Sequence, residues 1–115
     1  MVKEFDLEER TYRFAQRTFK TCKSISNNYI YKEYIDQLVR ASSSIGANYI
    51  EANESLSKKD FVYRIRICLK EAKESAYWIR LLKESQDQLQ LELSEIFQES
   101  VELKKIFAAI IQKSK

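Results

Sequence analysis

Apolar residues recur along most of this chain at the spacing of one face of an α-helix. The pattern predicts four amphipathic helices, at about residues 6–25, 30–54, 58–84 and 91–113. The breaks between them are short and polar: SNN at 26–28, ESLS at 54–57 and ESQDQ at 84–88. Short links join antiparallel neighbours, and each helix has one apolar face to bury. The sequence therefore predicts an all-α protein, an antiparallel up-down-up-down four-helix bundle, folded as a single domain over residues 1–115.

The residues expected in the core follow from the same spacing. They are Leu7, Phe14, Ala15, Phe19 and Cys22, then Tyr31, Ile35, Leu38, Ser42, Ile45, Tyr49 and Ala52, then Phe61, Ile65, Cys68, Ala72, Ile79 and Leu82, and last Leu93, Phe97, Leu103, Phe107 and Ile110. A period close to 3.5 residues favours the shallow left-handed crossing of helix bundles. Ser57, followed by Asp60, is typical of a helix start, with a capping hydroxyl and a carboxylate near the positive end of the helix dipole.

The second predicted helix contains residues that weaken helices. The stretch QLVRASSSIGANYIEAN, residues 37–53, holds three consecutive serines and the chain's only glycine. Small side chains let a neighbouring helix approach closely, and a serine hydroxyl can donate to the carbonyl one turn back. A polar seam also lies beside the apolar stripe, formed by Gln37, Ala41, Ser44, Asn48, Glu51 and Ser55. This seam is either a solvated face or a subunit interface, in which Ser44, Asn48 and Glu51 would take part.

Composition limits the fold classes and cellular locations that suit this chain. The chain has no proline and one glycine, and 32% of its residues are charged, which leaves little material for tight turns. It has no apolar run of the ~18 residues that a membrane span needs, and the start, MVKEFDLEER, lacks the apolar core of a signal peptide. We therefore expect a cytoplasmic protein without a membrane partner. Cys22 and Cys68 lie on apolar stripes and form no CxxC pair, so two reduced, buried thiols are expected.

Catalysis finds little support in the residues. The chain has no histidine, so the commonest general base is missing, and neither cysteine has an evident activating partner. Di-iron bundles need Glu-x-x-His pairs, which are absent from the sequence. Glu71 with Glu74, and Glu95 with Glu99, could collect a hard cation, but surface acids at helical spacing are more often only solvated. We predict no catalytic residues, no cofactor and no metal site, and hence a protein that is not an enzyme.

Two lines of basic residues are the strongest functional signal. On the third predicted helix, heptad spacing aligns basic and aromatic residues opposite the apolar stripe: Lys59, Tyr63, Arg66, Lys70, Lys73, Tyr77 and Arg80. The first helix has a similar line: Arg10, Arg13, Arg17 and Lys20. Such rows bind phosphates through charge and counterion release, and interleaved tyrosines can stack on unpaired bases. The alternative is a solvated face, partly neutralised by Glu71 and Glu74, in a chain whose net charge is only +3.

The last predicted helix carries the opposite charge. Glu92, Glu95, Glu99 and Glu102 share one face. An acidic face on one helix and a basic face on another would suit a head-to-tail contact between identical subunits, and such contacts close into rings when the rotation permits. The ring interface and the nucleic-acid interpretation would then compete for the same basic residues.

The segment SSSIGANYIEANESLSKKDFVYRIRICLKEAKESAYWIRLL resembles the signature of a family of bacterial four-helix-bundle proteins. The family is encoded in intervening sequences of large-subunit ribosomal RNA genes and is related to the accessory variability determinant of diversity-generating retroelements. The likeness rests on Ser44-Ile45, Asn48, Glu51, Ser57-Lys58, Phe61, Glu71-Ala72, Glu74, Tyr77-Trp78 and Leu81-Leu82. Gly46 and Ala52 depart from it, since proline and glycine are frequent there in the family; both departures favour a continuous helix.

The resemblance implies a homopentameric ring and, for the retroelement relatives, a basic surface that binds nucleic acid and a reverse transcriptase. For most of the family it implies no established activity. Our leading hypothesis is an oligomeric accessory protein that binds RNA or DNA. Its phosphate-binding residues would be Arg10, Arg13, Arg17, Lys59, Arg66, Lys70, Lys73 and Arg80. The alternative hypothesis is a ring-forming protein-interaction scaffold that binds no nucleic acid.

Overall fold

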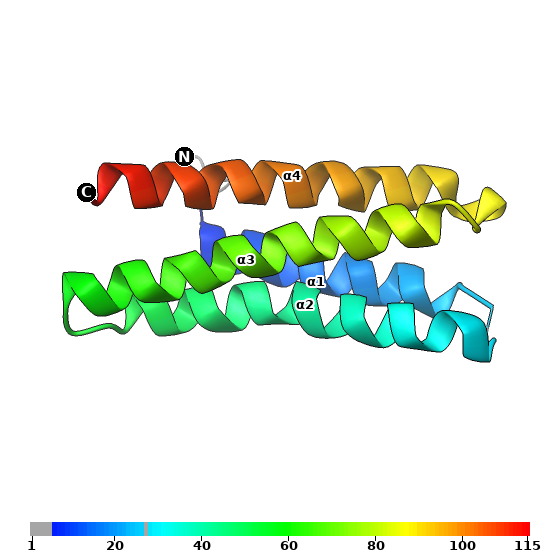
Figure 1. The fold of residues 1–115 in the computed structure, drawn as a ribbon, viewed down its shortest axis with the longest axis horizontal. Helices are drawn as coiled ribbons and strands as arrows, with labels where there is room; N and C mark the ends of the chain where they lie inside the picture. The colour runs from blue at the N-terminus through cyan, green and yellow to red at the C-terminus, as the bar shows by residue number, and fades with distance from the viewer. Residues whose placement is uncertain (1–5, 27) are drawn as a thin grey trace.

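The computed structural model describes residues 6–26 and 28–115. Its elements are α1 (Leu7–Lys23), α2 (Tyr29–Asn53), α3 (Lys58–Lys83), the short 3-10 helix η1 (Asp87–Leu89) and α4 (Gln90–Lys113). Successive α-helices run in opposite directions along the long axis of the molecule (Figure 1). The described residues form no strand, and the predicted all-α, up-down-up-down bundle is confirmed.

Side-chain caps fix where three of the helices begin. The Asp6 carboxylate accepts a hydrogen bond from Glu9 N at 3.3 Å, and the Asn28 amide oxygen accepts one from Ile30 N at 2.9 Å. Ser57 Oγ accepts from Asp60 N at 3.1 Å, which confirms the predicted start of α3. Each cap satisfies a backbone N–H that has no partner within its helix.

The core consists mainly of the predicted stripes. Its largest fully buried apolar side chains are Phe14, Phe107, Leu38, Ile45, Ile65, Ile79, Leu82, Leu93, Ile96 and Leu103. Phe19 was expected there, and this prediction is wrong: its exposed fraction is 53%, and Lys23 Nζ lies 5.7 Å from its ring centroid. Thr11 and Thr18 are fully buried on the inner face of α1, so that face is rotated away from Phe19. Threonine is not counted as apolar, which hid this rotation in the sequence pattern.

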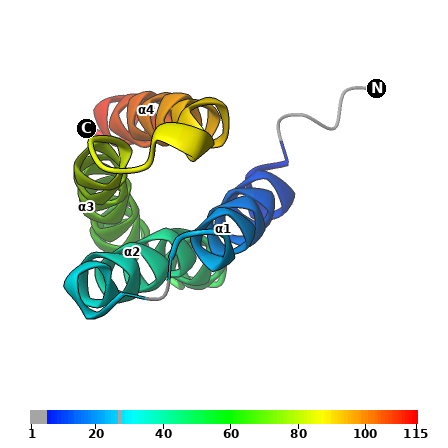
Figure 2. The same ribbon diagram turned by 90° about the vertical axis from the view of Figure 1, so that its right-hand side faces the viewer.

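The four helices do not close into a square. α1 packs against α2, α2 against α3 and α3 against α4, whereas α1 and α4 stand apart and leave one side of the bundle open (Figure 2). The opening lies on the opposite side of the molecule from α3. This arrangement gives α1 one close neighbour and gives α3 two.

The weak helix formers of α2 serve close packing. Ser42 is buried, and its Oγ donates to Val39 O at 3.3 Å. A Cβ atom at Gly46 would lie only 3.1 Å from Thr11 Oγ1, so α1 and α2 approach closely at the chain's single glycine. The prediction that these small residues allow close helix approach is confirmed.

The two cysteines are free and buried, as predicted. Burial raises the pKa of the Cys22 thiol to about 11 and that of the Cys68 thiol to about 12. Both are therefore protonated and unreactive at neutral pH. Within the described ranges, none of the helices has the length and apolar character needed to cross a membrane.

Candidate nucleic-acid interface

The basic row of α3 comprises Lys59, Arg66, Lys70, Lys73 and Arg80, with Tyr63 and Tyr77 between them. All seven side chains are exposed. α2 and α4 cover the two flanks of α3, so the row points outward. In the part of the chain that the structure describes, none of the five basic residues has an ion-pair partner within 4.0 Å. Their charges are thus available to a ligand.

The two acids expected to neutralise this row are engaged elsewhere. Glu71 is only 5% exposed, and its Oε2 lies 3.4 Å from Arg40 Nη1 of α2. Glu74 Oε1 lies 2.8 Å from Arg40 Nη2. Arg40 therefore holds both carboxylates at the α2–α3 contact. Sequence reasoning missed the burial of Glu71, although its place three residues after the buried Cys68 put it on the inner face.

The two tyrosines of the row differ in how their rings are held. Tyr77 meets Trp78 edge-on, with ring centroids 5.2 Å apart, and Trp78 packs in turn against Tyr34 at 5.7 Å. Trp78 therefore serves packing between α2 and α3. Tyr77 is held by its neighbour yet remains 56% exposed, and Tyr63 is 61% exposed. Both rings offer surface on which an unpaired base could stack.

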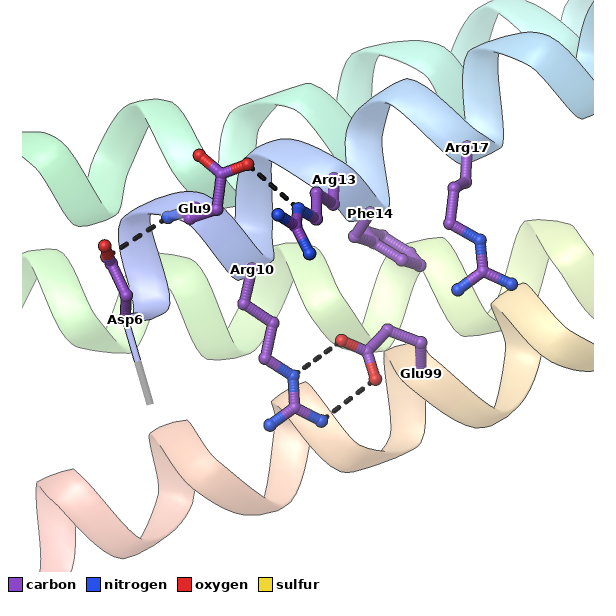
Figure 3. Close-up of a pocket in the computed structure, with 7 residues that line it drawn as sticks. All are labelled: Asp6, Glu9, Arg10, Arg13, Phe14, Arg17 and Glu99. Carbon is purple, nitrogen blue, oxygen red and sulfur yellow. Dashed lines mark hydrogen bonds and ion pairs between the residues drawn. The ribbon is translucent and has the colours of Figure 1, made fainter. Parts of the chain in front are cut away.

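The three arginines of α1 all have carboxylate partners, unlike the row of α3. Figure 3 shows the pairs of Arg10 with Glu99 and of Arg13 with Glu9. Arg10 donates from Nε and Nη2 to the two carboxylate oxygens of Glu99, at 2.7 and 3.0 Å. This hydrogen bond raises the pKa of Arg10. Arg17 Nη2 lies 3.2 Å from Glu95 Oε1, and Arg13 pairs with Glu9 of its own helix at 2.9 Å. The predicted phosphate ligands of α1 are thus already bound to carboxylates.

A groove follows the open side of the bundle between α1 and α4. Its main part has a volume of about 950 Å³ and is lined by Asp6, Glu9, Arg10, Arg13, Phe14, Arg17 and Glu99. A second part of about 300 Å³ continues past Arg17 to Lys20, Glu92 and Glu95. We call the two parts together the α1–α4 groove. Its α1 wall is rich in basic side chains, and its α4 wall is acidic.

The polar seam of α2 is largely used within the chain. Asn48 Oδ1 accepts from Arg64 Nη1 of α3 at 3.0 Å, and its Nδ2 donates to Ser44 O at 2.9 Å. Ser44 and Asn48 are half-buried, whereas Glu51 is exposed. Of the three predicted interface residues, Glu51 is the one whose side chain stands open to solvent.

The acid pairs considered for a cation are occupied by arginines. Glu71 and Glu74 hold Arg40, while Glu95 and Glu99 hold Arg17 and Arg10. Across residues 6–26 and 28–115, no group of three or more histidine, cysteine or acidic side chains is placed to bind a metal ion. The geometry that remains is electrostatic: one exposed basic face on α3 and one groove with walls of opposite charge.

These features define an antiparallel four-helix bundle with a basic outer helix. Residues 3–109 match the family model of the 23S rRNA-intervening sequence protein, and the chain belongs to that family, as the sequence signature indicated. It is also similar to a crystal structure from Bacteroides thetaiotaomicron, described as a protein with unknown function from the S23 ribosomal protein family. The TM-score is 0.79 at 30% identity, covering 90% of this chain and 96% of that one. No curated protein matches this chain.

Proposed function

We propose that this protein is a non-enzymatic accessory protein of the cytoplasm that binds RNA or DNA phosphates on the basic row of α3. The observation that carries the proposal is the set of five exposed basic side chains on one helix face, none of them paired with a carboxylate within the described residues. The proposal assigns no catalytic residue, cofactor or metal. The two free, buried cysteines suit a reducing compartment.

The chemistry of the row fits a polyanion. Lysine and arginine bind phosphates and release condensed counterions, while Tyr63 and Tyr77 supply stacking surfaces that accept any base. Arg10, Arg13 and Arg17 add a second line on α1, weakened by the carboxylates that hold them.

Fluorescence anisotropy with a labelled single strand and a structured RNA, at about 50 and 200 mM salt, tests this proposal. Binding should be steeply salt-dependent. The variant Arg66→Glu/Lys70→Glu/Lys73→Glu should weaken it by at least about a hundredfold at the lower salt, because three phosphate contacts become repulsive.

The matched control is Lys104→Glu/Lys105→Glu/Lys113→Glu, which makes the same change in net charge on α4. It should weaken binding far less, and circular dichroism should show that both variants keep their helices. Equal losses in the two variants, or no binding by the wild type at the lower salt, would refute the α3 row as the site.

A ring-forming interaction scaffold is the second candidate, and exposed apolar side chains favour it. Tyr29 and Ile30 lie in the first turn of α2, and Leu91 lies in the first turn of α4, at the same end of the bundle (Figure 1). Their exposed fractions are 86%, 60% and 69%. Leu56, in the α2–α3 link at the other end, is 99% exposed. Such side chains favour contacts with other subunits. In this candidate the protein forms a homo-oligomer, which the family resemblance suggests is a pentamer, with Ser44, Asn48 and Glu51 near its interface. A reverse transcriptase is one partner to test.

A further inference from the structure

The α1–α4 groove has both the residues of a phosphate site and a reason for that site to be closed. We infer that it is a latched site for a single nucleic-acid strand, in which Glu99 and Glu95 of α4 occupy Arg10 and Arg17 until phosphates displace them. This inference rests on the proposed function, because it assigns a second and regulated surface to the same ligand. The row of α3 would bind first, since no carboxylate competes for it within the described residues.

The first support is the geometry of the Arg10–Glu99 pair. Both carboxylate oxygens accept from the same guanidinium, at 2.7 and 3.0 Å, in the two-point arrangement that arginine also makes with phosphate. The side chains are 29% and 19% exposed, so solvent and ligands reach the pair from the groove. Glu99 therefore stands where a phosphate would stand.

The second support is that α1 and α4 pack only loosely against each other, so the two ion pairs bridge a weak contact. α1 rests on α2, and α4 rests on α3, with the groove between them (Figure 2). The pair Arg17–Glu95 is about half exposed on both sides and contributes little by itself. Opening the two pairs would leave the packing of α1 on α2 in place, because that packing includes the close approach of Thr11 to Gly46 and uses neither Arg10 nor Arg17.

The third support is the size and layout of the groove. The groove is open to solvent, with a volume of about 950 Å³ that continues into a further 300 Å³, so an extended ligand can lie along it. The four basic residues of its α1 wall span about 15 Å along the helix from Arg10 to Lys20. The facing carboxylates of Glu92, Glu95 and Glu99 repel a phosphate while the latch is closed, so removing the two that hold arginines should both free the ligands and lower the repulsion.

The test compares two variants with the same change in charge. Glu95→Gln/Glu99→Gln weakens the latch. Glu33→Gln/Glu54→Gln removes one exposed carboxylate from α2 and one from the residue that follows α2, and neither lines the groove. Both double variants are made in the wild type and in the Arg66→Glu/Lys70→Glu/Lys73→Glu background. In that background, which we call silenced, the α3 row should no longer bind phosphates. The probe is a fluorescein-labelled ten-nucleotide oligothymidylate at about 50 mM salt.

In the silenced background, the latch variant should bind about tenfold more tightly than its control, as expected when a competing state is removed. Adding Arg10→Gln/Arg17→Gln should abolish that gain. Equal affinities of the latch variant and its control, or no binding by the latch variant, would overturn the inference. The proposed function fails by a different result: unchanged binding when the α3 row alone is reversed in wild type.

Discussion

At the residue scale, Gly46 shows how one position sets the distance between two helices. Glycine in a helix interior costs up to about 1 kcal/mol relative to alanine. Here a Cβ would meet Thr11 Oγ1 at 3.1 Å, and that hydroxyl is fixed by donating to Leu7 O at 2.7 Å. The neighbour cannot turn away without losing its hydrogen bond, so the backbone of α1 would have to move.

We therefore expect Gly46→Ala to destabilise the protein by about 1 kcal/mol, because overpacking outweighs the gain in helix propensity. In a Thr11→Ala background, the same change should stabilise by about 0.5 kcal/mol, since the obstructing oxygen is gone. Urea unfolding of the four proteins in this cycle measures both values. If Gly46→Ala has the same effect in the two backgrounds, Thr11 is not what limits the approach of α1.

At the scale of the helices, Arg40 of α2 pairs with the buried carboxylate of Glu71 on α3. Glu71 lies in the α2–α3 contact, where a charge without a partner is costly. Arg40→Met should destabilise the protein by about 2 kcal/mol, and Arg40→Met/Glu71→Met should recover most of that loss because it removes the buried charge as well.

Thermal and urea unfolding of the single and double variants measure this coupling. Lys32→Met is the control, since it breaks the exposed Lys32–Asp36 pair at 2.7 Å on the same helix and should leave stability unchanged. A double variant that is no more stable than Arg40→Met would show that the arginine acts through packing of its stem and not through its charge.

The positions of the elements were predictable, and the orientation of α1 was not. Each predicted helix ends within about two residues of its observed bounds, because short polar links interrupt a strong apolar period. The predicted inner face of α1 wrongly included Phe19, because the buried threonines of that face are not counted as apolar residues. The bridging role of Arg10 and Arg17 was equally hidden, because a partner on α4, more than 70 residues away, is set by the tertiary fold.

At the scale of the whole molecule, the assembly remains a prediction. If the ring interface includes the exposed Glu51, then Glu51→Lys should convert a pentamer into smaller species by placing like charges at each contact. Native mass spectrometry would report masses as multiples of the 13.7 kDa chain. Glu54→Lys, one turn further along and also exposed, is the matched control. A wild-type protein that is monomeric at micromolar concentration would refute the ring.

The basic row of α3 was predictable in position but not in its availability. Heptad spacing alone places Lys59 to Arg80 on one face, because the inner face of a helix with two neighbours is well marked by apolar residues. That the nearby acids turn to Arg40 depends on which side chain α2 brings opposite them. Sequence spacing cannot supply that information.

The length of the basic row on α3 has a consequence for the shape of the proposed ligand. From Lys59 to Arg80 the helix rises about 32 Å without a proline or glycine to bend it, a length equal to about nine steps of duplex DNA at 3.4 Å each. Over that distance a strand of a duplex winds almost once around its axis and leaves the row. A polynucleotide that contacts every basic residue of the row at once must run straight, so the proposed α3 site would favour an unwound strand of about that length over a duplex.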